Sequence, residues 1–500
     1  MFRRILGLLL SMMLALIPAL GMAQTSFTMA GFDGEDSTRD WATNGFFTRM
    51  EARTGLSFTF QQYNEQAKWQ AAKDAMFAQG GELPDVLFKA GLTTDELIRY
   101  TESGQLIDLL PLLPENAPNL WALLQQNPDW LKAITLPSGK VGALPGIQEL
   151  PPQNAMWINR SWLDKLGLEM PTDMESLRKV LTAFRDRDPN GNGKKDEIPM
   201  LFLGPWELKF FSHAWGVAVN DYNIYLDDAG QVQYWPQEDR FFAMAEVLRS
   251  MYADGLLDPE GFVTADALRR VSENDAVITY GAFFAPSPVA LLVYSSGAEN
   301  YSVMGPFAYE GKKVYRDLIG NITRGTFAIT SACEDPAALL KWVDRLYTEE
   351  GAIEAMVGEE DVNYYFREDG AWDWVGGAEA LGVSGLSELT IYDTGDMPWL
   401  FPLEFNNRYF EDNVGRMNDE LAQLTQYAVQ PFPTYTLTTE ENAYVGSLQM
   451  ELGRYVDETL ARMVLGEVEI TEETKAAFKA GLEQRGVNDM IAFWQNIADR

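Results

Sequence analysis

The segment from residue 26 onward alternates strand patterns with helix patterns, and this alternation constrains the fold more than any other feature. Residues 26–30, 57–60 and 85–88 are short apolar stretches typical of strands, and residues 41–51 and 68–78 between them have helical spacing. A strand, a helix and a second strand in this order fold as a right-handed unit with parallel strands. The sequence therefore predicts an α/β protein.

The rest of the chain continues this pattern. A strand is expected to end at Trp157–Ile158, and the next helix is expected to begin with a capping box of Thr172 and Glu175. The remaining elements are expected as a strand at 326–330, a helix from Asp335, and C-terminal helices near 410–427, 440–465 and 473–498. Because no repeat or low-complexity linker separates them, we expect strands that cross between lobes to make any domain division.

Composition and charge narrow the class of protein. The 500 residues are 46% hydrophobic and 22% charged, as in globular proteins. The net charge is -34, and the acidic residues are spread along the chain. A field of that sign repels nucleic acids and anionic membranes, so we expect no nucleic-acid partner.

The N-terminus has the three parts of a secretory signal peptide. Residues 1–23 combine two arginines, an apolar run and small residues before Gln24. A membrane anchor is the alternative, but the apolar run is short and contains Pro18. The single cysteine, Cys333, allows no intramolecular disulfide, and no lipobox cysteine follows the signal. We expect an exported, soluble protein in the periplasm or outside the cell, not membrane-spanning after cleavage.

A loop in the middle of the chain has the spacing of calcium ligands. Calcium binds six to eight oxygens in flexible geometry, and the loop between 188 and 197 places candidate oxygens at alternate positions. The candidate ligands are Asp188, Asn190, Asn192, the backbone carbonyl of Lys194, Asp196 and Glu197. A polar surface turn is the alternative, since Asp, Asn and Gly form turns without metal.

This loop also departs from an EF-hand. The twelfth position holds Pro199 where an EF-hand needs Glu, and no second helix is expected directly after it. Glu197 is therefore expected to complete the calcium shell early. We predict a structural Ca²⁺ and no catalytic role, because nothing adjacent resembles a nucleophile or an open metal site.

Together with this loop, the segments 157–168 and 171–172 resemble the family 1 extracellular solute-binding proteins of carbohydrate ABC transporters. The likeness is strongest to the long branch with alginate-oligosaccharide-binding and LipO-type members. Weaker matching segments are 81–85, 104–109, 139–145, 255–260 and the last fifteen residues. The resemblance implies a structural calcium away from the ligand, an oligosaccharide ligand, ABC transporter permease partners, and a monomer.

The resemblance further implies a two-lobed periplasmic-binding-protein-like (type II) fold. Each lobe would be a mainly parallel sheet flanked by helices, with extra C-terminal helices. We expect residues 24–148 and about 311–360 in the N-terminal lobe, and residues 149–310 and about 361–500 in the C-terminal lobe with the calcium loop. The lobes would close on a glycan like a clamp.

Sugar contacts are expected from aromatic and polar side chains on loops that follow strands, because open α/β sheets bind ligands there. The candidates are Arg39, Trp41, Tyr63, Trp69, Gln148, Glu149, Trp206, Trp215, Tyr280, Phe283, Phe284 and Trp399. By contrast, Trp162, Trp342 and Trp494 have helical spacing and are expected in the core. The single histidine, His213, is expected to be a hydrogen-bonded structural residue.

Two alternatives stay open beside a sugar-binding protein. A secreted polysaccharide hydrolase or lyase also needs aromatic side chains, acids and calcium, and a pair of carboxylates is compatible with so acidic a chain. No catalytic motif is present, so we expect no enzyme. A binding protein for a non-sugar solute is the second alternative.

Overall fold

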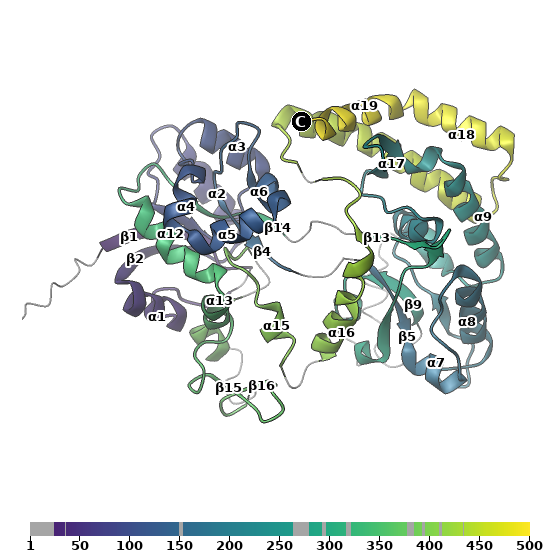
Figure 1. Ribbon diagram of the computed structural model, residues 1–500, viewed down its shortest axis with the longest axis horizontal. Helices are drawn as coiled ribbons and strands as arrows, with labels where there is room; N and C mark the ends of the chain where they lie inside the picture. Colours follow the sequence, from purple (N-terminus) through teal and green to yellow (C-terminus); the bar gives the residue numbers. More distant parts are fainter. Residues whose placement is uncertain are drawn as a thin grey trace, which may run out of the picture.

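The chain folds into two lobes that lie side by side (Figure 1). The computed structural model describes residues 25–35, 37–149, 154–263, 280–292, 297–316, 322–377, 385–392, 396–409, 413–433 and 435–500. The expected signal peptide lies outside these residues. Within the described ranges, no helix has the length and apolar character needed to cross a membrane.

The first lobe is built on a five-stranded sheet with the strand order β2-β1-β3-β14-β4. Its strands are β1 (Thr25–Phe32), β2 (Leu56–Tyr63), β3 (Val86–Phe88), β4 (Leu144–Ile147) and β14 (Ile322–Ile329). β1 pairs in parallel with β2 and β3, which confirms the predicted βαβ order. β14 runs antiparallel to both β3 and β4.

Helices cover this sheet, and their ends follow the local sequence. They are α1 (Gly45–Thr54), α2 (Gln66–Phe77), α3 (Thr94–Glu102), η1 (Leu110–Leu112), α4 (Leu113–Asn116), α5 (Pro118–Gln126), α6 (Pro128–Ile134), α12 (Pro336–Asp344), η6 (Arg345–Tyr347), α13 (Glu349–Met356) and α15 (Leu403–Asn406). The Asn44 side chain caps the start of α1, and Gly55 ends it in the left-handed conformation at φ 70°.

The second lobe is built on a four-stranded sheet with the order β10-β5-β9-β6. Its strands are β5 (Ala155–Asn159), β6 (Ile198–Met200), β9 (Tyr280–Ala285) and β10 (Tyr301–Met304). β5 runs antiparallel to β9 and β10, and only β6 and β9 pair in parallel among the described strands of this sheet.

The expected fold class is confirmed, and in each sheet one strand, β14 or β5, runs antiparallel to the others. The reason is how the chain crosses between the lobes. β4 leaves the first sheet at the edge where β14 enters it, so these neighbouring strands run in opposite directions. β5 enters the second sheet at the edge where β10 leaves it, with the same result.

The helices of the second lobe include the long C-terminal ones that the resemblance implied. They are α7 (Arg160–Leu166), α8 (Met174–Asp186), η2 (Pro205–Trp215), η3 (Trp235–Gln237), α9 (Asp239–Ala253), η4 (Pro259–Phe262), α11 (Pro288–Leu291), η5 (Ala298–Asn300), α16 (Asn413–Ala422), η7 (Thr425–Tyr427), α17 (Thr439–Val464), α18 (Glu472–Gln484) and α19 (Val487–Ala498). The last three lie across the top of the lobe in Figure 1.

Four short strand pairs complete the fold. They are β7 (Ile224–Leu226) with β8 (Val232–Tyr234), β11 (Ala308–Tyr309) with β12 (Lys312–Lys313), β15 (Tyr364–Phe366) with β16 (Trp372–Trp374), and the parallel pair of β13 (Tyr315–Arg316) and β17 (Ala428–Val429). The parallel pair joins two segments more than a hundred residues apart in sequence.

The capping box of α8 lies one residue later than predicted. Asp173, not Thr172, is the N-cap, and its side chain accepts a hydrogen bond from the Ser176 amide at 2.7 Å. The Ser176 hydroxyl in turn accepts from the Asp173 amide, so Ser176 takes the place expected for Glu175. A carboxylate is a stronger acceptor than a hydroxyl, which favours Asp173 over its neighbour.

Each lobe has its own apolar core. The first core gathers the aromatic side chains of α1 and β2 around Trp342, which is 1% exposed. The second gathers α8, α9 and the three C-terminal helices, and it includes Trp162 and Trp494. All three tryptophans that were expected in the core are buried.

The packing near the lobe boundary bears on the predicted division. Trp399 and Phe401 belong to the first core, and the Phe401 amide donates to the Ile147 carbonyl at 2.8 Å. This packing favours a crossing after α15, later than the boundary near 360 that the sequence suggested. The division itself stays a prediction.

The start of α17 touches the first lobe through polar contacts. The Thr439 hydroxyl donates to Asp95 at 2.9 Å, and the Thr436 hydroxyl donates to the Ala133 carbonyl at 3.3 Å. The C-terminal helices therefore contact both lobes.

Gly325 provides a test of how β14 enters the first sheet. It has φ 72° beside an irregularity of the β14–β4 pairing, and an added Cβ would lie 2.3 Å from the Leu92 carbonyl oxygen. We expect Gly325→Ala to lower the free energy of unfolding by about 2–3 kcal/mol. Urea denaturation measures this.

The matched control is Gly446→Ala in α17, where an added Cβ meets no described atom within 4 Å. It is expected to raise stability by up to about 1 kcal/mol, because alanine favours helix interiors. Equal effects of the two substitutions would contradict the close approach at Gly325.

Candidate functional site

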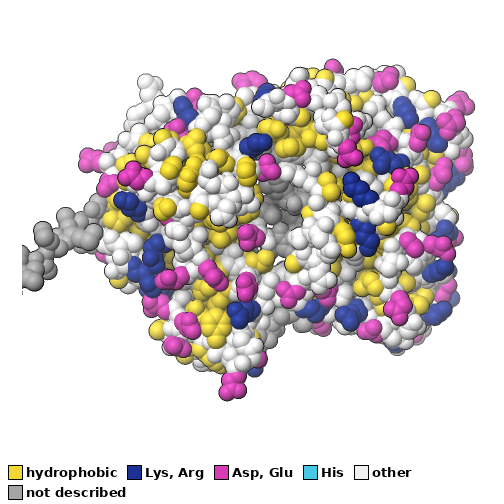
Figure 2. All heavy atoms as spheres, in the orientation of Figure 1, with side chains coloured by type: hydrophobic (Ala, Val, Ile, Leu, Met, Phe, Trp, Pro, Cys, Tyr) yellow, Lys and Arg dark blue, Asp and Glu magenta, His cyan; other side chains and the backbone are white. Residues whose placement is uncertain are grey.

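Two sheet edges face each other across the space between the lobes. β1, β2, β3 and β4 end at one edge of the first sheet, since β1 pairs in parallel with β2 and β3 and β14 runs antiparallel to β3 and β4. β6, β9 and β10 end at the edge of the second sheet where β5 begins. The crossing segments join these two edges, and Figure 2 shows the surface hollowed between the lobes. Ligands of α/β proteins bind at such strand ends.

A buried carboxylate organises the edge of the first lobe. Asp33 follows β1 directly and is 0% exposed. Its oxygens accept hydrogen bonds from Arg39 Nη1 at 2.8 Å, Trp41 Nε1 at 2.9 Å and Lys89 Nζ at 3.1 Å. The Ser37 hydroxyl also donates to it. Buried charges are stable only when paired, so these contacts lock the loops after β1 and β3 together.

This cluster changes how two of the expected sugar contacts are interpreted. The Arg39 guanidinium forms an ion pair with Asp33 and also donates a hydrogen bond to the Tyr392 carbonyl at 3.2 Å. Trp41 is 0% exposed, packed in the first core. Asp33 and Lys89 were missed by the sequence analysis, although an acid and a lysine directly after two buried strands were the available signal.

The other candidates of the first lobe lie at the same edge but differ in exposure. Trp69 is buried, with its Nε1 donating to the Ala90 carbonyl, and Tyr63 lies against it with ring centroids 5.4 Å apart. Tyr63 and Gln148 are half-buried, and Glu149 is exposed. Trp399 is buried beside Ile147, with its ring 5.1 Å from that of Tyr392.

Trp206 is the most exposed aromatic side chain among the candidates. It follows β6 and is 42% exposed. Its ring covers the backbone of Gly204 and lies 6.1 Å from Phe210 in an edge-to-face arrangement. A supported ring with one free face at a strand end is suited to stack on a sugar.

The remaining aromatic candidates of the second lobe are buried. Trp215, Phe283 and Phe284 are 9% exposed or less. Tyr280 is also buried, and it begins β9, which places it at the edge of the sheet away from the first lobe. Tyr280, Phe283 and Phe284 pack in the lobe because β9 is a central strand with covered faces. Trp215 ends η2 and packs in the second core.

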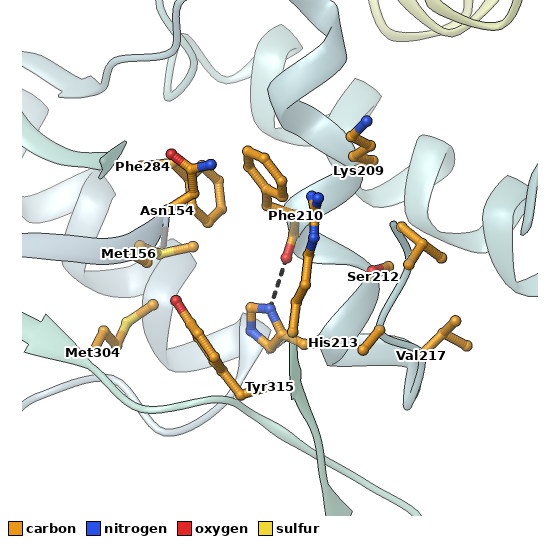
Figure 3. Close-up of a pocket in the computed structure, with 13 residues that line it drawn as sticks. Asn154, Met156, Lys209, Phe210, Ser212, His213, Val217, Phe284, Met304 and Tyr315 are labelled. Carbon is orange, nitrogen blue, oxygen red and sulfur yellow. Dashed lines mark hydrogen bonds between the residues drawn. The ribbon is translucent and has the colours of Figure 1, made fainter. Parts of the chain in front are cut away.

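A small pocket lies at the end of the second sheet that faces the first lobe. It lies between η2, the start of β5 and the crossing strand β13, and Figure 3 shows His213 and Tyr315 in its lining. Arg316 also lines the pocket, and these three residues form its polar side. His213 Nδ1 lies 2.8 Å from the Phe210 carbonyl oxygen, as expected for a structural histidine. Burial lowers the pKa of His213 to about 4, so the ring is neutral at pH 7.

The predicted calcium loop folds around its first aspartate. The Asp188 carboxylate accepts from the amides of Gly191, Asn192 and Gly193 at 2.9–3.1 Å. Asp188 itself has φ 45°, and Gly191 and Gly193 have positive φ as well. The Asn192 side chain lies within 2.9 Å of the Asp196 carboxylate. The loop lies between α8 and β6, at the edge of the second sheet where β6 begins, which is opposite the edge that faces the first lobe.

The residues of the loop fit a calcium ion. Glu197 Oε1 is buried and finds no hydrogen-bond partner among the described residues. Burial raises the pKa of Glu197, and the negative charges of Asp188 and Asp196 add to this rise. A divalent cation relieves that repulsion. In the described part of the chain, no group of three or more His, Cys, Asp or Glu side chains has metal-binding spacing, so asparagine and backbone oxygens would have to complete the shell.

Comparison with known proteins gives one relative along most of the chain. The sequence is 25% identical to the fructooligosaccharide ABC transporter substrate-binding protein FusA of Streptococcus pneumoniae over 478 residues, which are 90% of this chain and 86% of FusA. A 131-residue stretch is 28% identical to the lipoprotein LipO of Bacillus subtilis, covering 25% of this chain and 24% of LipO. No family model matches the chain.

Solved structures give the same class of fold. FusA in complex with kestose has a TM-score of 0.67 at 22% identity, covering 95% of this chain and 99% of FusA. An HMO-binding solute-binding protein of Bifidobacterium longum infantis has a TM-score of 0.73 at 19% identity, covering 95% of this chain and 99% of that protein. The alginate-binding protein AlgQ2 has a TM-score of 0.62 at 18% identity, covering 95% of this chain and 98% of AlgQ2.

These likenesses confirm the resemblance inferred from the sequence. The chain is a relative of the substrate-binding proteins of ABC transporters, and it has their two-lobed α/β fold. Its long C-terminal helices belong to the aligned region, since the solved structures match 95% of the chain.

Asp33 provides a test of the first-lobe edge. We expect Asp33→Ala to lower the free energy of unfolding by about 3–5 kcal/mol, because Lys89 and Arg39 would lose the carboxylate between them while still buried. Chemical denaturation measures this.

Asp369→Ala is the control for this substitution. Its carboxylate is largely exposed and lies 3.4 Å from Arg367, so the expected loss is under about 1 kcal/mol. A comparable loss from both substitutions would contradict the organising role of Asp33.

Proposed function

We propose that this protein binds an oligosaccharide outside the cytoplasm and delivers it to an ABC importer. The observation that carries the proposal is the likeness to FusA over 90% of the chain, in a fold whose two sheet edges face each other. FusA is named for fructooligosaccharides, and the solved neighbours are named for HMO and alginate. Their common ligand class is the oligosaccharide.

The side chains at the facing edges support a carbohydrate ligand. Trp206 offers a free aromatic face from the second lobe, and Gln148 and Glu149 offer polar groups on a crossing segment. Sugars have apolar C–H faces and polar hydroxyls, so a site with both kinds of surface suits them. Of the twelve predicted contacts, we retain Trp206, Gln148, Glu149, Tyr63 and Arg39 as candidates. The others are packed in the cores, and one of them, Phe284, also lines the small pocket at the end of the second sheet.

Capture would occur by closure of the lobes on the ligand. The rigid cluster at Asp33 holds the first edge in shape, and η2 holds Trp206 on the second. A ligand that contacts both edges stabilises the closed arrangement by its differential affinity for it. The transporter would then distinguish the loaded protein by this closed shape.

The loop between 188 and 197 would hold a structural calcium ion. Its ligands would be Asp188, Asn190, Asn192, the Lys194 carbonyl, Asp196 and Glu197. Glu197 Oε1 is buried and has no hydrogen-bond partner among the described residues, which supports this assignment. A solved FusA variant is named an EF-hand mutant, and a solved AlgQ2 structure is named as being without calcium ion, and both names support this proposal. The ion supplies charge neutralisation that stiffens the loop.

The remaining features of the proposal follow from the sequence. The chain would be exported through the signal peptide at residues 1–23, act as a soluble monomer, and dock to permease subunits. It would carry out no chemistry on the glycan. The appearance of new reducing ends or unsaturated products during incubation with a glycan would contradict this part.

Ligand binding is tested by thermal unfolding with a panel of oligosaccharides. A glycan at about 100 times its Kd stabilises the folded state by about 2.7 kcal/mol and raises Tm. We expect a shift with at least one oligosaccharide and none with peptides. A shift with peptides alone would contradict the proposal.

Trp206→Ala is expected to weaken binding of that glycan by about 10- to 100-fold in calorimetry, because the stacking face is lost. Met450→Ala, at an exposed apolar side chain of α17, is the control and should bind normally. An unchanged affinity of the Trp206→Ala variant for the glycan would show that Trp206 is not part of the binding site.

Calcium is tested by removal. We expect a chelator to lower Tm by several degrees and excess Ca²⁺ to restore it, because the ion binds only the folded loop. Glu197→Gln should shrink this calcium-dependent shift, whereas Asp186→Asn, at an exposed side chain just before the loop, should not. An identical Tm with and without chelator would contradict the calcium site.

A further inference from the structure

The pocket at the end of the second sheet has one apolar side and one polar side. The ring centroids of Phe210 and Phe284 lie 5.6 Å apart, so the two rings pack against each other. With Met156 and Met304, they form the apolar side of the pocket. Figure 3 shows the His213 ring and the Tyr315 side chain side by side in the same space. All of these residues are buried, so the pocket is part of the folded lobe and not a surface dent.

The polar side holds buried atoms that lack partners. His213 Nε2, the Tyr315 hydroxyl and Arg316 Nη1 make no hydrogen bond to any described residue. Buried polar atoms without partners are rare in folded proteins and mark places where a water or a ligand binds. Three of them in one pocket indicate a built site.

The chemistry of these atoms selects a hydroxyl group. His213 Nδ1 is hydrogen-bonded to the Phe210 carbonyl, so Nδ1 carries the proton and Nε2 is an acceptor. Arg316 only donates, and Tyr315 does both. A hydroxyl can donate to His213 while accepting from Arg316, whereas a carboxylate has no proton to donate.

The charges around the pocket also disfavour an acidic group. Arg316 Nη2 pairs with Asp221 Oδ1 at 2.6 Å, and Lys209 lies 3.9 Å from the same carboxylate. Asp457 acts on Lys209 as a second negative charge. Two cations therefore face two carboxylates, which leaves no surplus positive charge for an acidic sugar.

The size of the pocket limits what enters it. The space in it that the centre of a water molecule can occupy is about 20 Å³. About 10–15 Å³ accommodates one water-sized group. One hydroxyl therefore fits inside, and the carbon and ring that carry it would lie outside, against the edge of the packed Phe210–Phe284 pair.

We propose that this pocket is a specificity subsite for the hydroxymethyl arm of a neutral hexose in the bound oligosaccharide. It rests on the proposed function, and it names the ligand class: neutral glycans with a free hydroxymethyl group, not uronic acids or pentose chains. The hydroxyl donates to His213 Nε2 and accepts from Arg316 and Tyr315. The apolar side contacts the C–H face of the same sugar.

The single histidine makes the proposal directly measurable. His213 is the only histidine in the chain, so protein labelled with ¹⁵N in the imidazole gives one pair of ring nitrogen signals. The probes are kestose, maltotriose and cellotriose as neutral hexose chains, with xylotriose and trigalacturonate as counterparts lacking the hydroxymethyl group. Thermal unfolding with each probe reports binding independently of the pocket.

The expected result is that a hexose probe raises Tm and shifts the Nε2 signal, while xylotriose and trigalacturonate do neither. A hexose that raises Tm without moving Nε2 overturns the subsite and leaves the proposed function standing, with an ordered water as the only occupant. If only xylotriose or trigalacturonate binds, the subsite is likewise overturned and the proposed function stands. A panel with no binder defeats the proposed function, and the subsite with it.

Tyr315→Phe separates recognition from folding. Its hydroxyl has no partner among the described residues, so its removal should leave Tm without ligand unchanged. Affinity for the hexose probe should fall about tenfold. Tyr444→Phe, at a half-exposed tyrosine of α17, should bind as the unaltered protein does. Unchanged affinity in Tyr315→Phe would overturn the role of its hydroxyl.

Discussion

The arrangement of the molecule depends on where the chain crosses between its lobes. Each sheet receives the chain at the edge where it also releases it, so β4 with β14 and β5 with β10 must run in opposite directions. The same constraint turns the ends of most strands toward the partner lobe. The loops that carry Asp33, Lys89 and Trp206 therefore meet a common space, although they are far apart in sequence.

The two edges are stabilised in different ways. The first uses one buried carboxylate shared by Arg39, Lys89 and Trp41, which fixes several loops with few atoms. The second uses aromatic packing under Trp206, with polar atoms of the small pocket left over. A rigid edge and an edge with unsatisfied groups suit a protein that binds first and closes afterwards.

Most of the fold could be predicted from the sequence, because βαβ periodicity and capping signals are local. Strand direction in β14 and β10 could not, since it depends on the crossing and not on neighbouring residues. The residues of the site were harder to predict from the sequence than the fold. Position after a strand selected Trp206 and Gln148, which follow strands that end at the facing edges, but it also selected Trp41 and Phe283, whose burial is decided by distant helices. Asp33 and Lys89 each follow a buried strand, but only the folded sheet shows that their side chains pair.

The polar contacts at the start of α17 affect how the lobes move. Thr439 and Asp95 are joined by an exposed hydrogen bond that water can replace at little net cost, whereas the bond between Thr436 and the Ala133 carbonyl is buried. An apolar seam of the same extent would resist separation more strongly. The hydrogen bonds between the C-terminal segment and the first lobe are directional, so a change in the angle between the lobes would have to break them.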